Sequence, residues 1–240
     1  MLWKTGTNHT FQLFFAGLLL SCVILAQNGQ NLMSDDVLKQ VGRAYGEQGR
    51  KVFAHWVEFV TEQSPKEAEV NERQVLDSIN RYFNERLKFV SDSEHWQQED
   101  YWATPLESLS TAAGDCEDYV IAKYFSLIQA GIAQDKLRIT YVKAVRLNQA
   151  HMVLAYYETP KSEPLILDNL KPDILRASKR RDLVPVYSFN GIGLWLERQQ
   201  GSIKVGNADG LGMWMDLLTR MEEQGLGPWM QLPHSQSATQ

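Results

Sequence analysis

The first half of the chain has the hydrophobic spacing of amphipathic helices. Apolar residues recur at intervals of three and four over residues 35–63, with a break expected at Gly46 and Gly49, and again over about 68–89. A third helix is predicted over residues 116–130, because the glycine that follows it is a typical C-terminal stop. The apolar stripe of the second helix is expected to face the core, through Val70, Val75, Ile79, Phe83 and Leu87.

The region between the second and third helices is polar and acidic from Ser91 to Tyr101, which predicts a loop. A short turn or helix is expected to follow over residues 106–109. No glycine-rich phosphate-binding loop follows a predicted strand, so the sequence gives no support to a nucleotide-binding fold.

The hydrophobic period changes from helical to alternating after residue 131. Strands are predicted over residues 138–147, 151–157, 165–168, 184–189, 194–197 and 202–205. Asn190-Gly191 and Gln200-Gly201 are typical hairpin turns, and a last helix is expected over residues 211–224. Helices followed by a meandering antiparallel sheet indicate an α+β fold.

The N-terminus has the pattern of an export signal. Residues 1–26 contain no acidic residue and one lysine, and their apolar run of 16 residues from Phe11 is short for a membrane span. We therefore predict a signal peptide over 1–26, a flexible lead-in over 27–34, a single domain over 35–231 and a disordered tail over 232–240. Two alternatives stay open: an uncleaved anchor, and a lipoprotein in which Cys22 carries the lipid.

Composition narrows the class of protein. With 44% hydrophobic and 22% charged residues, the chain is neither disordered nor a polytopic membrane protein. Its formal net charge of −5 argues against a nucleic-acid partner, because phosphate binding needs a basic face. No membrane-spanning segment is expected after signal cleavage. Cleavage would also leave Cys116 as the one cysteine, so no internal disulfide could form.

Cys116 is predicted to lie in the first turn of its helix. Asp115 is a good N-cap and Asp118 lies three residues further on, as in a capping box, so the helix dipole would favour the thiolate. A thiolate nucleophile needs a base, and His151 begins a strand that follows this helix. If that strand pairs with the next one antiparallel, Asp168 could orient the imidazole, with Asn169 as the alternative.

These residues carry a family resemblance. Trp-Ala-Thr-Pro-Leu-Glu at 102–107, Gly-Asp-Cys-Glu-Asp-Tyr-Val-Ile-Ala-Lys-Tyr-Phe at 114–125, Ala-His at 150–151 and Leu-Asp-Asn at 167–169 resemble the bacterial transglutaminase-like cysteine proteinases of the LapG type. The resemblance covers roughly residues 35–189. It implies a papain-like or transglutaminase-like core with a Cys116–His151–Asp168 triad.

The same resemblance implies a biological setting. The expected enzyme is a periplasmic cysteine endopeptidase whose substrate is the N-terminal region of a large surface adhesin, cut at a double-alanine site. Cleavage would release the adhesin and promote biofilm dispersal. The implied regulator is a LapD-type inner-membrane receptor, which sequesters the protease when cyclic di-GMP is high.

The acidic neighbours of the cysteine raise an electrostatic problem. Asp115, Glu117 and Asp118 would raise the pKa of a thiol that has to ionise. A bound cation would neutralise them, and calcium suits carboxylate oxygens outside the cytoplasm. LapG-type enzymes are similarly calcium-dependent, which implies these three acids as ligands. The alternative is that they only cap the helix.

The expected chemistry is acyl transfer through a covalent intermediate on Cys116. The backbone N–H of Cys116 is one candidate oxyanion donor, and the indole of Trp102 is a second, although tryptophan more often serves packing. A transglutaminase or amidase with the same triad, a non-catalytic periplasmic adaptor and a single-cysteine redox sensor are the competing hypotheses. Trp195, Trp214 and Trp229 are expected in the core or, alternatively, in a receptor-facing patch.

Overall fold

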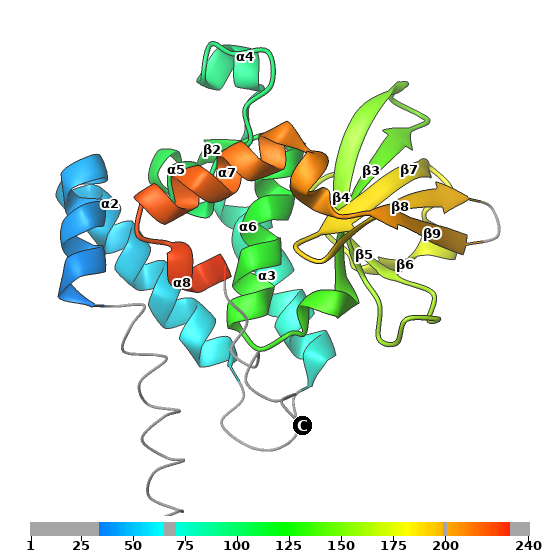
Figure 1. Cartoon of the computed structure of the whole chain (residues 1–240), viewed down its shortest axis with the longest axis horizontal. Coiled ribbons are helices and arrows are strands. Elements are labelled where there is room, and N and C mark those ends of the chain that lie inside the picture. The colour runs from blue at the N-terminus through cyan, green and yellow to red at the C-terminus, as the bar shows by residue number, and fades with distance from the viewer. Residues whose placement is uncertain (1–33, 65–70, 199–200, 231–240) are drawn as a thin grey trace, which may run out of the picture.

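The predicted helices and strands form a helical layer beside an antiparallel sheet (Figure 1). The computed structural model describes residues 34–64, 71–198 and 201–230. The helices are α2 (Asp35–Gln63), α3 (Glu72–Arg86), α4 (Asp92–His95), α5 (Pro105–Thr111), α6 (Cys116–Gln129), α7 (Gly212–Glu223) and α8 (Gly227–Met230). None of these helices is long and apolar enough to cross a membrane. The predicted signal peptide, with Cys22, most of the lead-in and the tail lie outside the described residues.

The sheet has seven strands in the order β6-β5-β4-β3-β7-β8-β9, and every neighbouring pair is antiparallel. Its strands are β3 (Leu137–Ala144), β4 (Gln149–Tyr156), β5 (Leu165–Leu167), β6 (Leu175–Arg176), β7 (Leu183–Asn190), β8 (Gly193–Arg198) and β9 (Gly201–Gly206). Two meanders therefore meet where β3 pairs with β7. A separate parallel pair is formed by β1 (Lys88–Phe89) and β2 (Ala113–Gly114). The α+β fold class is confirmed.

Helix α6 forms the centre of the core. It lies between α2 and the sheet in Figure 1, and all its residues from Glu117 to Ile128 are buried. Trp56 of α2 donates a hydrogen bond to Ser126 Oγ at 2.9 Å, and Trp214 of α7 stacks on Phe125 with ring centroids 5.7 Å apart. The first residue of α6, Cys116, is thus placed at the end of a rigid, fully packed helix.

Several predicted elements differ in their boundaries. The second helix begins at Glu72 and stops at Arg86, because residues 88–89 pair with β2 as a short strand. The predicted loop over 91–101 contains the short helix α4, and the strand β6 and the helix α8 were not expected. Val75, Ile79, Phe83 and Leu87 are buried as predicted, whereas Val70 lies outside the described residues.

The predicted break in the first helix is present at Gly46. Its φ of 67° and ψ of −166° interrupt the helical backbone, and a positive φ of this kind favours glycine. Gly49 is helical and buried, and a Cβ there would collide with the side chain of Tyr45. One glycine therefore bends α2 and the other permits close packing.

Two of the three late tryptophans fall within the described side chains. Trp214 is 2% exposed and belongs to the core, as predicted. Trp195 is half-buried on β8, where the Arg138 guanidinium lies 4.2 Å from its ring centroid. The side chain of Trp229 is outside the described part of the chain.

Candidate active site

The start of α6 is fixed by carboxylate hydrogen bonds. Asp118 Oδ2 accepts from the backbone N–H of Asp115 at 3.2 Å, which is the returning half of the predicted capping box. Its other oxygen, Oδ1, accepts from the backbone N–H of Ala103 at 2.7 Å. Asp118 is completely buried, so it ties the first turn of α6 to the segment that precedes α5. Cys116 lies in that first turn, where the sequence placed it.

The thiol of Cys116 is kept protonated by burial and by the carboxylate of its neighbour Glu117. Its Sγ–H donates to Glu117 Oε2 at 3.0 Å. Burial raises the pKa of Cys116 most, the negative charges of Glu117 and Asp115 raise it further, and the backbone N–H of Met152 lowers it. With these groups alone, the cysteine is a protonated thiol at neutral pH. A nucleophile requires that this negative charge be neutralised.

His151 and Asp168 are in direct contact. His151 lies on β4 and Asp168 directly follows β5, and these strands pair antiparallel as expected. Asp168 Oδ1 lies 2.8 Å from His151 Nε2, and both side chains are buried. This contact leaves Nδ1 as the imidazole nitrogen available for proton transfer. Asn169, the alternative partner, has a buried Oδ1 without a hydrogen bond.

Asp168 is held as a carboxylate. Its burial alone would raise its pKa, but the hydrogen bond and charge of His151, the N–H of Leu170 and the Arg180 guanidinium outweigh burial and lower it. Arg180 Nη2 lies 2.6 Å from Asp168 Oδ2, and the N–H of Leu170 donates to Oδ1 at 3.0 Å. Arg180 was not anticipated from the sequence, because nothing in a basic run at 179–181 indicates which member is buried.

Cys116 and His151 line one cavity of about 620 Å³. Met152, Tyr141 and Tyr187 form part of its wall, and the two tyrosine rings stack with centroids 5.1 Å apart. A cysteine at a helix start that shares a cavity with an oriented imidazole is suited to nucleophilic acyl transfer.

Trp102 also lines the cavity, but it has a clear packing role. It is 6% exposed and stacks on Phe189 of β7 with ring centroids 5.7 Å apart. Its backbone carbonyl accepts from Arg220 Nη2 of α7 at 2.5 Å. Its role as an oxyanion donor stays a prediction.

The acidic cluster is larger than the sequence indicated. Oxygens of Asp92, Asp115 and Asp118 lie within 4.8 Å of one another, and so do those of Asp92, Asp100 and Glu117. Asp92 on α4 therefore belongs to both groups. The acidic segment 91–101 carried this signal, but an acidic stretch is also typical of a solvated loop, so Asp92 and Asp100 were missed.

The cluster fits a hard divalent cation. Asp92 Oδ1 and Asp115 Oδ1 are buried and have no hydrogen-bond partner. Burial raises the pKa of Asp92 to about 6 and that of Asp115 to about 8, where Glu117 adds to the effect. Buried carboxylates with free oxygens at this spacing are the ligand chemistry that calcium prefers. Asp115, Glu117 and Asp118, the three predicted ligands, all lie in these groups.

Comparisons with known proteins agree on one family. The family model for the bacterial transglutaminase-like cysteine proteinases matches residues 56–185. The solved structure of EGTA-treated LapG from Legionella pneumophila is 42% identical, covers 78% of this chain and 96% of its own, and superposes with a TM-score of 0.67. Calcium-bound LapG from the same organism is 41% identical, covers 77% and 97%, and has a TM-score of 0.64. A comparison with curated proteins finds no match.

Proposed function

The chain belongs to the bacterial transglutaminase-like cysteine proteinases, and from this premise we propose that it is a calcium-dependent periplasmic endopeptidase that cuts a large surface adhesin. Family membership makes it a cysteine peptidase. The proposed cleavage falls at a double-alanine site in the N-terminal region of the adhesin and releases it, which promotes biofilm dispersal. In this proposal a LapD-type receptor sequesters the enzyme when cyclic di-GMP is high.

One observation carries the proposal: Cys116 shares a cavity with His151, whose Nε2 lies 2.8 Å from the buried Asp168 carboxylate. Nδ1 of His151 takes the thiol proton as Cys116 Sγ attacks the scissile carbonyl carbon. The same imidazole returns that proton to the leaving amine as the C–N bond breaks. Water then hydrolyses the thioester, which frees the new carboxylate and restores the thiol.

Asp168 and Arg180 assist these proton transfers through His151. The Asp168 carboxylate keeps the proton of the neutral imidazole on Nε2 and stabilises the imidazolium once it forms, and the Arg180 guanidinium keeps that carboxylate ionised and in place. The backbone N–H of Cys116 lies in the first turn of α6, where amides have no partner within the helix, and we assign it to the oxyanion.

The residues proposed to hold calcium are Asp92, Asp115 and Asp118, with Asp100 and Glu117 beside them. When bound there, the cation supplies positive charge that offsets the carboxylates around the cysteine. The calcium-bound structure of Legionella LapG supports calcium binding by this chain, and the unpartnered carboxylate oxygens of Asp92 and Asp115 support its placement in this cluster.

The deciding experiment mixes the purified chain with N-terminal adhesin fragments from the same cell, with calcium and with EGTA. We expect new termini at a double-alanine site with calcium and intact fragments with EGTA. Cys116→Ala is the matched control: it should bind calcium and leave the fragments uncut. Equal cleavage by this variant would contradict the proposal. Crosslinked products without new termini would favour the transglutaminase alternative.

A further inference from the structure

Lys123 is a fully buried lysine on α6, two helical turns beyond Cys116. Its Nζ donates to Asn84 Oδ1 of α3 at 2.7 Å. Among the described residues, no carboxylate lies within ion-pair distance of this ammonium. Burial lowers the pKa of Lys123 to about 7, against an opposing effect of the Asp168 charge. An apolar side chain would fill this position at a smaller desolvation cost, so the lysine calls for a specific role.

Asn84 links Lys123 to the proposed triad. Its Nδ2 donates to the backbone carbonyl of Asp168 at 2.9 Å. A protonated lysine can only donate, so the Lys123 ammonium fixes the Asn84 amide with its oxygen toward α6 and its NH₂ toward Asp168. The opposite orientation would place two donors against each other and the amide oxygen against the Asp168 carbonyl.

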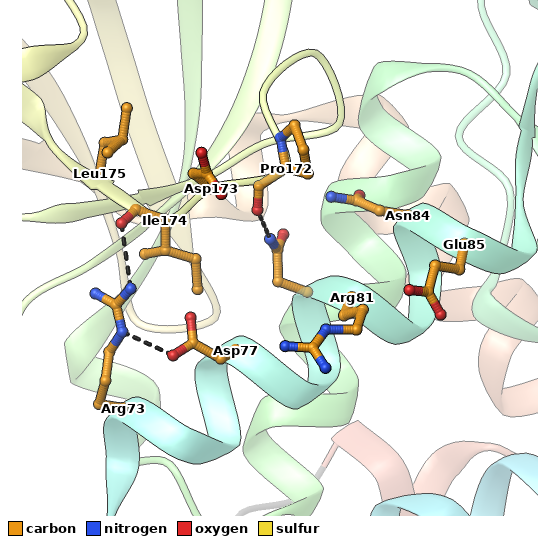
Figure 2. A pocket seen from close by; sticks show the side chains of 10 residues that line it. Arg73, Asp77, Arg81, Asn84, Glu85, Pro172, Asp173, Ile174 and Leu175 are labelled. Carbon is orange, nitrogen blue, oxygen red and sulfur yellow. Dashed lines mark hydrogen bonds and ion pairs between the residues drawn. The ribbon is translucent and has the colours of Figure 1, made fainter.

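The hydrogen bond from Asn84 to Asp168 is the first of three that α3 donates to backbone carbonyls within residues 168–174. Asn80 donates to the carbonyl of Pro172 at 2.7 Å, and Arg73 donates to the carbonyl of Ile174 at 3.3 Å. Figure 2 shows Arg73 and Asn84 on α3, on the side that faces residues 172–175. Helix α3 therefore holds the backbone of residues 168–174 in place, and Asn84 makes the first of these contacts, at the carbonyl of Asp168.

We infer that Lys123 is a positioning residue of the protease: through Asn84 it fixes the Asp168 backbone, and thereby aims the Asp168 carboxylate at His151. The inference rests on the proposed function. The carboxylate itself is held by Arg180 and by the N–H of Leu170, whereas the carbonyl of the same residue is held by Asn84. Different groups thus hold the carboxylate and the backbone of Asp168, and a displacement of either one misaligns the imidazole of His151.

The test separates positioning from stability by using Asn84→Asp in the full-length, calcium-loaded protein. The new carboxylate still accepts from Lys123, now as an ion pair, but it opposes the Asp168 carbonyl instead of donating to it. We expect an unchanged or higher Tm, a kcat about tenfold lower and a KM within about twofold of the wild type. Lys123→Met should lower kcat by a similar factor, and the double variant should lower it no further.

Ser126→Ala is the matched control on α6. It removes the hydroxyl that accepts from the Trp56 indole, and neither residue is among the hydrogen-bond partners of Asp168 in the described part of the chain. We expect a lower Tm and an unchanged kcat, the reverse of the result for Asn84→Asp. A kcat within twofold of the wild type for Asn84→Asp would overturn the inference, and so would additive losses in the double variant. Asn84→Asp decides the matter if Lys123→Met does not fold.

Alkylation of Cys116 by iodoacetamide separates this inference from the proposed function, because it needs no adhesin. The reaction depends on transfer of the thiol proton to His151, so Asn84→Asp and Lys123→Met should both be alkylated about tenfold more slowly than the wild type. If the wild type cuts no adhesin fragment, the proposed function fails, and alkylation alone then decides the role of Lys123. Equal alkylation rates would reject it.

Discussion

Asp92 contributes a buried carboxylate to the acidic cluster from a different element than the cysteine. One of its oxygens accepts from the N–H of Tyr101 at 2.6 Å, and the other has no partner. Because Asp92 belongs to both groups of carboxylates, a cation bound to either group would use it. It therefore brings a carboxylate from α4 next to those at the start of α6.

Asp92→Asn should weaken calcium binding by about tenfold or more, because an amide replaces a charged ligand without changing the shape of the side chain. Isothermal titration of the calcium-free protein measures the change. Asp36→Asn is the control, since the Asp36 side chain is 94% exposed and contacts Lys39 at the surface. Unchanged affinity in the Asp92 variant would remove Asp92 from the proposed ligand set.

The site residues that could be predicted either adjoin the cysteine in sequence or lie at the ends of predicted strands. Asp115, Glu117 and Asp118 adjoin the cysteine, and the strand pattern placed Asp168 near His151. Asn84 and Arg180 could not be identified, because each is one polar residue among several in its segment. Only the packing of α3 and of the segment after β6 against Asp168 distinguishes them.

At the scale of elements, Arg220 connects α7 to α5 and to the segment that precedes α5. Its guanidinium donates to Glu107 Oε2 at 2.7 Å, to the Tyr101 hydroxyl at 2.8 Å and to the carbonyl of Trp102. Residue 103 in turn donates to Asp118 at the start of α6. A C-terminal helix therefore supports the wall of the proposed active site.

Arg220→Ala should lower the free energy of unfolding by about 2 kcal/mol, because it leaves the largely buried Glu107 carboxylate without its ion pair. Chemical denaturation measures this change. Arg50→Ala is the comparison, as Arg50 forms an exposed ion pair with Glu47, and its loss should cost less than about 0.5 kcal/mol. Equal effects of the two substitutions would show that α7 is not held through Arg220.

Elements were predictable where their own periodicity is strong. The long helices and the strands β3, β4 and β7 follow from spacing alone. Strand β5 was also predicted, over 165–168, but β1, β2 and β6 were not, since strands of two residues carry too few positions for alternation to show. Their existence depends on the partner strand, as at Lys88 and Ala113, which lie 25 positions apart in the chain.

For the whole molecule, the acidic cluster makes stability depend on pH and calcium together. Burial raises the pKa of Asp115 to about 8 and of Asp92 to about 6, above their values in the unfolded chain. Without calcium the native state therefore holds more protons than the unfolded state. The stability that Asp92 and Asp115 contribute is therefore fully present below their unfolded pKa and is lost as the pH rises through the folded values.

We expect the Tm of the EGTA-treated protein to fall between pH 5 and pH 8. Calcium binds the deprotonated carboxylates, so the Tm gain on adding it should be larger at pH 8 than at pH 5. Thermal unfolding at the two pH values, with and without calcium, measures both effects. A calcium-free Tm that rises over this interval would contradict the proposed balance of charge.

The two edge strands of the seven-stranded sheet differ in length. The edge strand β6 has two residues, whereas β9 has six, with Ile203 and Val205 both about half exposed. A long edge with apolar side chains offers unpaired N–H and C=O groups to any extended chain. Lys204, between those two residues, does not guard this edge, because its ammonium turns back toward β8 and donates to the carbonyl of Ile192 at 2.8 Å. Self-association of the folded protein by strand pairing would therefore begin at β9.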